Sequence, residues 1–393
     1  MIKVLIATGI YPPDIGGPTA MVGALADALR ANFFAVKVIT YASPESVREK
    51  IADVTKIKRT KIKFFSFLNY FWHIVGLTLW ADIIYATDTY SVGYFAYLMK
   101  KIFNKKYIIR FAGDSAWEAV VSEGLTNDYI VDFQQKKYND RIEKLKARRQ
   151  IILKNADQVI AVSNFLADLL KLIEVELKKI TMIYNSVDFF SEAVDQQKLA
   201  VIKNKYGSEA KIMVTVCRLT PWKGVDGIIK TLPKLIEKVG PVNFLVLGDG
   251  DEINNLKKIV AETKTEDRVH FLGRINHDDT LTYMAAADLF ILNSNYEGLS
   301  HVLLEAIKMG VPVAASDVGG NPEVIDNNKN GLLFNYNNEE EILTAASKVL
   351  IDENYAKQLV VAANDKLKIF NWPENIKATI NLINKLCHEN NIN

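Results

Sequence analysis

Two glutamates, Glu297 and Glu305, lie eight residues apart in the segment E-G-L-S-H-V-L-L-E-A. Glu297 ends a strand-like run, and Glu305 lies in a helix-like run that ends at Gly310. A strand-to-helix turn of this kind points both carboxylates toward the carboxyl edge of a parallel sheet, where open α/β sheets bind their ligands. Because carboxylates accept hydrogen bonds from hydroxyl groups, the pair predicts a polar, hydroxyl-rich ligand.

The residues between the two glutamates favour the same interpretation. Backbone N–H groups at Leu299, Ser300 and His301 would face a phosphate at the start of the helix. Glu305 would accept two hydroxyls, as a ribose diol requires, and Glu297 would contact a sugar hydroxyl. The alternative is that Glu305 is a surface glutamate, since it has no obvious partner one turn later. The apolar neighbours indicate burial instead, where an unpaired carboxylate is costly.

Two cations stand in the segment C-R-L-T-P-W-K-G. Arg218 follows a strand-like run, and Lys223 comes just before the next helix. Arginine offers a planar fork and lysine a point charge, and together they can neutralise a diphosphate. The alternative is that both are ordinary loop cations facing water.

A glycine pair follows the first strand-like run, in Y-P-P-D-I-G-G-P. Gly16 and Gly17 remove side chains where the backbone must approach a ligand, and the helix after them offers free N–H groups to an anion. The loop matches neither the dinucleotide fingerprint nor the P-loop, and a plain strand-to-helix turn is the alternative.

Short apolar runs alternate with helical segments along the whole chain, and continuous runs indicate strands buried on both faces of a parallel sheet. The predicted strands are Lys3–Thr8, Val36–Thr40, Lys61–Ser66, Ile83–Ala86, Lys106–Phe111, Gln158–Ser163, Lys179–Tyr184, Ile212–Cys217, Val242–Gly248, Val269–Leu272, Leu289–Asn293, Pro312–Ala315 and Gly331–Phe334. Helices between them imply right-handed crossovers. The pattern restarts near residue 210, which places a boundary near 188–195 and predicts two Rossmann-like domains that enclose a cleft.

The ordered motifs resemble glycosyltransferase family 4, a retaining family with the GT-B fold, over nearly the whole chain. The resemblance is carried by the glycine loop, V-I-A-V-S-N-F, I-Y-N-S-V-D, R-L-T-P-W-K-G, L-G-D-G and E-G-L-S-H-V-L-L-E-A-I-K-M-G-V-P-V-A-A-S-D-V-G-G. It implies an N-terminal acceptor-side domain (1–190), a C-terminal nucleotide-sugar domain (191–372) and a last helix (373–393) that packs back on the first domain.

The resemblance also implies roles for single residues. Arg218 and Lys223 would hold the donor diphosphate, Glu305 the ribose and Glu297 the transferred sugar. Gly17, Gly319 and Gly320 would line the phosphates and the sugar, and the backbone near Arg274 and Ile275 would meet the base. No cofactor is implied beyond the nucleotide-diphosphate sugar itself.

One position departs from the family pattern. Many members carry a histidine after the fifth N-terminal strand, where this sequence reads I-I-R-F-A-G-D-S-A-W-E. Asp114 is the nearest polar candidate for a contact to the sugar or the acceptor. The alternative is that Asp114 caps the following helix, since Asp is a favoured N-cap, and the two roles can coexist.

Asp249-Gly250-Asp251 has the D-x-D form that binds a divalent metal in another glycosyltransferase fold. It follows a strand and opens a helix here, so Asp251 is better read as a first-turn acid favoured by the helix dipole. Because Arg218 and Lys223 can balance the diphosphate, we expect a metal-independent site.

Charge is unevenly distributed, although the formal net charge is only +2. Residues 1–190 carry 26 Lys and Arg against 19 Asp and Glu, which suggests that this half meets an anion. Basic residues at 56–63 precede the aromatic segment F-F-S-F-L-N-Y-F-W, and a second basic segment spans 136–149. A basic, aromatic-rich face of this kind is compatible with contact with anionic lipid, but basic residues usually face water, so a solvated strand edge followed by a core helix is the favoured interpretation.

The partners that we expect are therefore a nucleotide-sugar donor and a glycan or lipid-linked acceptor, with no nucleic acid. Peripheral membrane contact through the basic N-terminal domain is an open alternative. The N-terminus lacks the pattern of a signal peptide, and Cys217 and Cys387 form no disulfide framework, so we expect a cytoplasmic protein; association with the membrane is the open alternative.

The sequence favours a transferase that builds a polysaccharide or glycolipid, with two alternatives. A sugar-nucleotide 2-epimerase needs a proton-moving set of acids and bases, and the 5 histidines form no evident cluster. A catalytically weakened relative that only binds the nucleotide sugar is the other alternative, motivated by the missing histidine.

Overall fold

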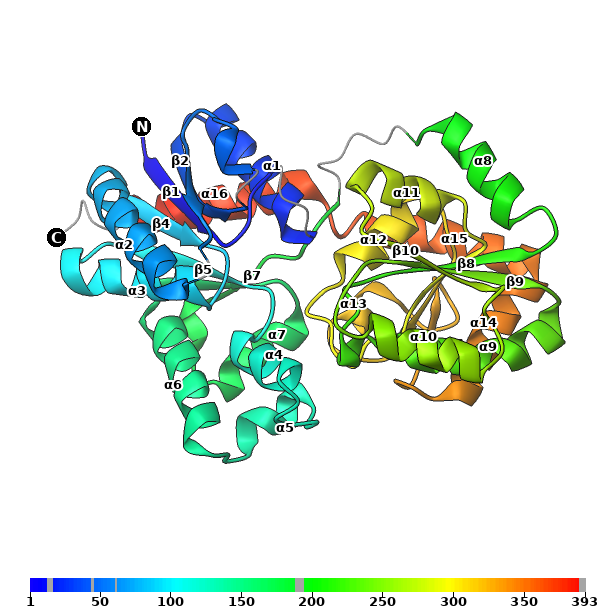
Figure 1. Cartoon of the computed structure of the whole chain (residues 1–393). Helices are drawn as coiled ribbons and strands as arrows, with labels where there is room; N and C mark the ends of the chain where they lie inside the picture. The colour runs from blue at the N-terminus through cyan, green and yellow to red at the C-terminus, as the bar shows by residue number, and fades with distance from the viewer. Residues whose placement is uncertain (13–16, 44–45, 61, 188–193, 389–393) are drawn as a thin grey trace. The chain divides into compact units, whose positions relative to one another are not determined.

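The computed structural model describes residues 1–12, 17–43, 46–60, 62–187 and 194–388. The chain forms two compact units (Figure 1): unit 1 comprises Met1–Asn185 with Trp372–Asn393, and unit 2 comprises Ser186–Asn371. The boundary predicted near 188–195 falls mainly on residues outside the described ranges.

Unit 1 is built on a seven-stranded parallel sheet of order β3-β2-β1-β4-β5-β6-β7. Its strands are β1 (Lys3–Thr8), β2 (Ala35–Ala42), β3 (Val54–Lys58), β4 (Ile83–Ala86), β5 (Tyr107–Phe111), β6 (Gln158–Ala161) and β7 (Ile180–Met182). The central strands are buried at nearly every residue, as expected for a sheet covered on both faces.

Helices connect these strands and cover the sheet. They are α1 (Gly17–Ala31), α2 (Lys63–Trp80), α3 (Ser91–Phe103), α4 (Ser115–Ser122), α5 (Ile130–Gln135), α6 (Asp140–Asn155), α7 (Asn164–Leu172) and α16 (Trp372–His388). The C-terminal helix α16 packs on unit 1 beside α1, as predicted (Figure 1). The Lys106 Nζ donates to the carbonyl of Leu386 at 2.7 Å, and the Asn375 side chain donates to the carbonyl of Tyr184 at 2.9 Å.

One predicted strand is wrong. Residues 63–66 of the predicted strand Lys61–Ser66 form the first turn of α2, and the strand at this edge of the sheet is β3, at Val54–Lys58. Polar and apolar residues alternate in K-I-K-F-F, as in a strand, but the alternation is short. The residues from Lys63 onward belong to an 18-residue apolar helix instead. No helix among the described residues combines the length and the apolar character needed to cross a membrane.

Unit 2 repeats the architecture with a six-stranded parallel sheet of order β10-β9-β8-β11-β12-β13. Its strands are β8 (Lys211–Val216), β9 (Val242–Leu247), β10 (Val269–Gly273), β11 (Leu289–Leu292), β12 (Val313–Ser316) and β13 (Leu332–Phe334). Its helices are α8 (Gln196–Tyr206), α9 (Val225–Val239), α10 (Ile253–Glu262), α11 (His277–Ala285), α12 (His301–Lys308), α13 (Asn321–Val324), α14 (Glu339–Ile351) and α15 (Glu353–Leu367).

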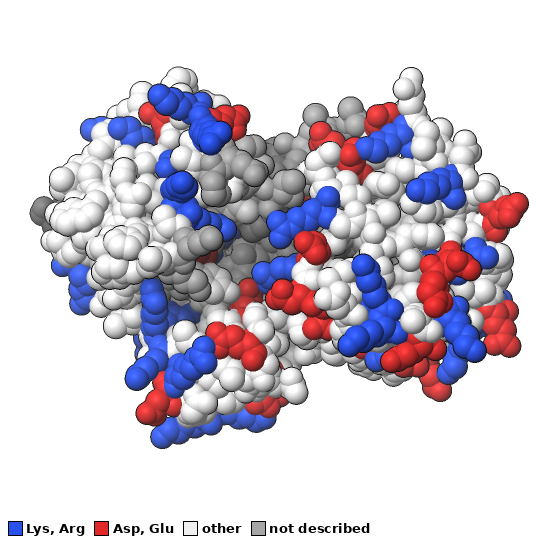
Figure 2. All heavy atoms as spheres, viewed as in Figure 1, with Lys and Arg blue, Asp and Glu red and all other residues white. Residues whose placement is uncertain are grey.

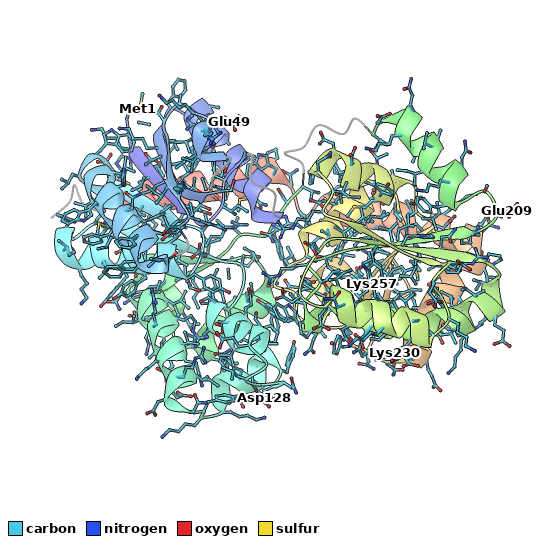
Figure 3. The ribbon with its side chains drawn as sticks, in the orientation of Figure 1. Met1, Glu49, Asp128, Glu209, Lys230 and Lys257 are labelled. Atoms are coloured by element: carbon cyan, nitrogen blue, oxygen red, sulfur yellow. The ribbon has the colours of Figure 1, made fainter. Side chains whose placement is uncertain are left out.

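Helices cover both faces of the second sheet. Apolar residues of α9, α10 and α14 pack with the strands in one core, and α11 and α12 lie on the opposite face (Figure 1). Lys230 lies on the outer side of α9, where it pairs with Asp226 at 2.9 Å (Figure 3). Burial on one side and charge on the other is what an amphipathic surface helix requires.

Each sheet has a topological switch point. In unit 1, β1 and β4 are neighbours whose following helices lead in opposite directions, and in unit 2 the same holds for β8 and β11. The carboxyl ends of such strands leave a crevice in which α/β proteins bind ligands. The two switch points are therefore the places where the fold favours functional residues.

Candidate active site

The switch point of unit 2 brings two predicted residues together. The loop after β8 carries Lys223, the loop after β11 carries Glu297, and the Lys223 Nζ lies 2.5 Å from the Glu297 Oε1. Ser294 donates to the same oxygen at 2.7 Å. The two charged side chains are only 17% and 12% exposed, so their interaction is weakly screened by solvent.

Arg218 lies in the same loop as Lys223 but faces solvent. Its guanidinium Cζ is 5.5 Å from the ring centroid of the buried Trp222, a cation–π geometry that orients the side chain. The neighbouring Cys217 packs against the core of unit 2, and burial raises the pKa of its thiol to about 12. At neutral pH this thiol is protonated, which excludes it as a nucleophile.

Gly319 and Gly320 pack directly against the backbone of the Glu297 turn. Gly319 has a φ of 56°, and a Cβ there would lie 2.0 Å from the carbonyl oxygen of Glu297. A Cβ on Gly320 would lie 2.3 Å from the carbonyl oxygen of Gly298, and the Gly320 N–H donates to the Glu297 carbonyl at 2.9 Å. Only glycine allows this approach, so the pair positions Glu297; contact of the glycines with a donor stays a prediction.

Glu305 has a partner that the sequence did not reveal. It is buried on α12, and its Oε1 lies 3.1 Å from the Nε2 of His277, the first residue of α11. Partners 28 residues apart on different helices leave no local sequence pattern. The histidine explains how a buried carboxylate is tolerated here, and the predicted ribose contact of Glu305 stays a prediction.

The start of α12 lies beside Glu297. Leu299 and Ser300 are buried, His301 is half-buried, and the Ser300 hydroxyl accepts from the N–H of Leu303 at 3.3 Å. Ser300 is therefore the N-cap of the helix. The predicted phosphate contact of this turn is not tested by the structure.

Arg274 and Ile275 follow β10 at the same edge of the sheet. The Arg274 Nε lies 3.9 Å from a carboxylate oxygen of Asp249, and both side chains are exposed, while Ile275 is half-buried. The predicted place of Asp251 is wrong, because α10 begins at Ile253 and Asp251 lies outside its first turn. Among the described residues, no group of three or more His, Cys, Asp and Glu side chains is placed to hold a metal ion.

Asp114 in unit 1 is fully buried and caps α4, which confirms the capping alternative. Its Oδ1 accepts from the N–H groups of Ala116 and Trp117 at 3.0 and 3.4 Å. Its Oδ2 accepts from Gln134 at 2.9 Å and forms an ion pair with Arg149. A direct contact with sugar stays a prediction.

The glycine pair after β1 is only partly described. Gly16 lies outside the described residues, and Gly17 is the first residue of α1. The predicted binding of an anion at this loop therefore stays a prediction.

The switch point of unit 1 holds a cavity of about 820 Å³ that the sequence did not predict. Gly9 and Asp88, which follow β1 and β4, line its inner wall, and Arg59, Arg148 and Arg149 also line it. Burial raises the pKa of Asp88 to about 6, although the N–H groups of Tyr90 and Val92 oppose the shift. An Asp directly after a buried central strand was the one available signal for this site.

Comparison with known proteins identifies related families and folds. The model described as Glycosyltransferase Family 4 matches residues 15–189, and the model described as Glycosyl transferases group 1 matches residues 197–366. An uncharacterised glycosyltransferase of Methanocaldococcus jannaschii is 28% identical and covers 96% of both chains. N-acetyl-α-D-glucosaminyl L-malate synthase of Bacillus anthracis is 30% identical over 55% of this chain and 56% of its own.

Among solved structures, Anabaena HepE in complex with UDP-glucose matches with a TM-score of 0.80 at 17% identity, over 98% of this chain and 100% of that chain. At this identity the likeness concerns the fold. It confirms the predicted α/β fold class, GT-B, with two Rossmann-like domains on parallel sheets.

Proposed function

This chain belongs to glycosyltransferase family 4, and we propose that it is a retaining enzyme that moves a hexosyl group from a nucleotide-diphosphate sugar to a glycan or lipid-linked acceptor. The observation that carries the proposal is the Lys223–Glu297 pair at the switch point of unit 2, where a cation and an acid meet at 2.5 Å beside a helix start. This site offers both signs of charge to one ligand, as a diphosphate joined to a sugar requires.

Each charged group has a distinct role in this proposal. Lys223 and Arg218 bind the diphosphate, and Glu297 binds the sugar, because the Glu297 Oε1 accepts from both Lys223 and Ser294 and leaves Oε2 for a sugar hydroxyl. Glu305, held by His277, accepts the ribose hydroxyls. Arg274 and Ile275 lie near the base, and the start of α12 faces a phosphate.

The chemistry follows from the charges that develop during transfer. The bond between the sugar carbon and the diphosphate breaks, and preorganised cations stabilise the leaving oxygens. The acceptor hydroxyl attacks from the same face, and the departing diphosphate oxygen takes its proton, which retains the configuration. Lys223 and Arg218 supply the positive charge that a metal would otherwise supply, so turnover should continue in EDTA; loss of turnover that Mg²⁺ restores would contradict metal independence.

The donor class is supported by the related proteins. HepE was solved with UDP-glucose, and the Bacillus anthracis relative is named for N-acetylglucosaminyl transfer. We therefore propose a hexose or N-acetylhexosamine carried by a nucleoside diphosphate as the donor.

A donor panel tests the proposal. The protein is incubated with UDP-, GDP- and ADP-linked hexoses, and released nucleotide and sugar products are measured. Release of nucleotide with transfer or hydrolysis of the sugar supports the transferase. Interconversion of the donor sugar without release would instead identify an epimerase, and binding without turnover would identify an inactive relative.

We also propose that unit 1 rests on an anionic membrane through α2. The apolar face of α2, formed by Phe65, Leu68, Trp72 and Leu79, is exposed, with Trp72 and Leu79 67–68% exposed. Figure 2 shows a broad area without charged groups where Figure 1 places α2 and α3. The exposed Lys58 and Arg59 precede this helix, and a basic margin beside an apolar face suits anionic lipid. Flotation with anionic but not neutral liposomes is expected, and Trp72→Asp should abolish it.

A further inference from the structure

The cavity of unit 1 combines positive charge with hydroxyl groups. Arg59, Arg148 and Arg149 line it, and Asp88 is the single acidic residue among its described lining residues. Hydroxyl groups of Thr60, Ser66, Thr89, Ser91 and Ser115 are also at its wall. Its volume of about 820 Å³ is that of a small-molecule site. Because Asp114 already pairs with Arg149, the remaining balance is Arg59 and Arg148 against Asp88, which favours an anion that carries hydroxyl groups.

Arg149 lines the cavity, and its contacts with Gln134 and Asp114 fix its side chain. Its side chain is buried, its Nη1 donates to Gln134 at 2.8 Å, and the same nitrogen pairs with Asp114. Within the part of the chain that the structure describes, the buried Nε–H has no hydrogen-bond acceptor. A buried guanidinium donor without an acceptor is costly, so an anionic oxygen of a ligand would satisfy it.

Arg148 connects this cavity to a second, apolar hollow. A groove of about 480 Å³ is lined by Phe67, Tyr94, Tyr97, Ala147, Arg148 and Ile151, from α2, α3 and α6. Phe67 and Arg148 line both the cavity and the groove, so the two hollows are adjacent. The Arg148 guanidinium Cζ lies 4.4 Å from the Tyr94 ring centroid, which holds the cation at the junction.

We infer that the cavity and the groove together bind an anionic lipid, with its charged head among the three arginines and its hydrocarbon chain in the groove. A soluble anion would occupy the cavity alone and would leave the aromatic walls of the groove in water. An uncharged lipid would leave the positive charge of the cavity arginines without a counter-charge. Phe64, which lines the cavity, and Phe67, which lines both hollows, lie on α2, the helix that also carries the exposed apolar face.

This lipid is the acceptor in the transfer reaction, and that assignment rests on the proposed function. Binding of the lipid itself depends only on residues of unit 1, whereas the proposed donor residues lie in unit 2 apart from the glycine loop before α1. The two proposals therefore fail separately.

Three probes, used as monomers below their micelle concentrations, test the inference by calorimetry on the full chain. Decyl phosphate carries charge and chain, decyl glucoside carries the chain without charge, and glycerol 3-phosphate carries the charge without the chain. Decyl phosphate is expected to bind about tenfold or more tightly than either of the others, because only it uses both parts of the site. Equal binding of glycerol 3-phosphate, or no binding of decyl phosphate, would overturn the inference.

Two substitutions at exposed positions distinguish binding of the charged head from binding of the hydrocarbon chain. Arg148→Gln should weaken decyl phosphate about tenfold and leave decyl glucoside unchanged. Ile151→Asp should weaken both decyl compounds, and Leu172→Asp, on α7, is its matched control because Leu172 and Ile151 are 44% and 42% exposed. Unchanged binding in Arg148→Gln and Ile151→Asp would show that the lipid lies elsewhere.

Titration with a nucleoside diphosphate in the same experiment tells the two proposals apart. A protein that binds nucleotide but not decyl phosphate lacks the inferred lipid site and keeps the proposed function. A protein that binds decyl phosphate but no nucleotide has the inferred lipid site and lacks the proposed function. Binding to anionic vesicles without binding of monomeric decyl phosphate would overturn the site in favour of a surface contact.

Discussion

Single residues carry the proposed chemistry, and the clearest case is the Lys223–Glu297 pair. We expect Lys223→Ala to lower kcat/KM by about 10²- to 10³-fold, the size of the loss when one preorganised donor is removed from a developing anion. The substitution also leaves the carboxylate of Glu297 with only Ser294 as a donor among the described residues. Nucleotide release from the preferred donor measures the effect.

Lys230→Ala is the matched control. Lys230 also forms an ion pair, with Asp226 at 2.9 Å, but it lies on the outer side of α9 (Figure 3). An exposed pair of this kind contributes about 0.3–0.5 kcal/mol to stability, and turnover should stay normal. Near-normal turnover in both Lys223→Ala and Arg218→Ala would contradict the roles assigned to these residues.

We expect Asp88 to lower the stability of the protein at neutral pH and to support transfer to the acceptor. Its pKa is raised from 3.8 to about 6, so the native state holds a proton that the unfolded state has released between these values, and stability falls as pH rises through that window. Asp88→Asn removes this loss and should stabilise the protein by at most about 3 kcal/mol above pH 6. The variant and the wild type should become equally stable near pH 4.

Urea unfolding from pH 4 to pH 8 measures this difference. Asp88 lines the proposed acceptor cavity, and an ionised carboxylate accepts a hydrogen bond from a hydroxyl more strongly than a carboxylic acid or an amide does. Transfer to the acceptor should therefore fall in Asp88→Asn, and in the wild type it should fall as pH drops through about 6. A difference in stability that does not vary with pH would show that the pKa of Asp88 is the same in the native and unfolded states.

Residues of the site could be predicted where each stands alone at the end of a strand. Arg218, Lys223 and Glu297 follow buried strands, and their place at one sheet edge follows from parallel topology. The partners of two other site residues could not be predicted. His277 pairs with Glu305, and Arg149 pairs with Asp114, and the members of each pair come from different helices or loops. The cavity of unit 1 was missed for the same reason, since its arginines come from the loop after β3 and from α6.

At the scale of elements, the buried strands were predictable, whereas the edge strand β3 was not. Central strands such as β4 and β9 are continuous apolar runs, whose burial on both faces the sequence records directly. The edge strand β3 is a short V-T-K-I-K that is mostly half-buried, and the apolar start of α2 beside it gave the stronger signal. Residues 54–58 become a strand because they pair with β2, and a pairing between residues this far apart leaves no local pattern in the sequence.

The glycine loop after β12 is an element whose shape should control Glu297. Gly319→Ala introduces a Cβ 2.0 Å from the Glu297 carbonyl at a φ of 56°, so the loop must shift. We expect a loss of about 1–3 kcal/mol in stability and a large fall in turnover. Chemical unfolding and nucleotide release measure the two effects.

Gly310→Ala is the control that separates the cost of a positive φ from the cost of the steric clash with the Glu297 carbonyl. Gly310 has a φ of 72°, but a Cβ there meets nothing within 4 Å. This variant should lose about 1 kcal/mol and keep its turnover. If Gly319→Ala behaved in the same way as Gly310→Ala, the glycine loop would have no part in positioning Glu297.

The whole molecule consists of two units that each have their own parallel sheet and core. Proteins of this kind often depart from two-state unfolding, and ligands stabilise only the unit that binds them. Calorimetry should therefore resolve two transitions. Asp114→Asn breaks a buried ion pair and should lower the free energy of unfolding of unit 1 by about 3–5 kcal/mol. The transition whose temperature falls in this variant is therefore the unfolding of unit 1.

A nucleoside diphosphate at 100 times its Kd should then raise the other transition alone. The expected gain is about 2.7 kcal/mol, or about 5–10 °C for a unit of this size, because the proposed donor residues all lie in unit 2 apart from the glycine loop before α1. Lys223→Ala should reduce the shift, and Lys230→Ala should not. If the nucleotide instead raised the transition that Asp114→Asn lowers, the donor would bind unit 1, and the roles proposed for Arg218, Lys223, Glu297 and Glu305 would be wrong.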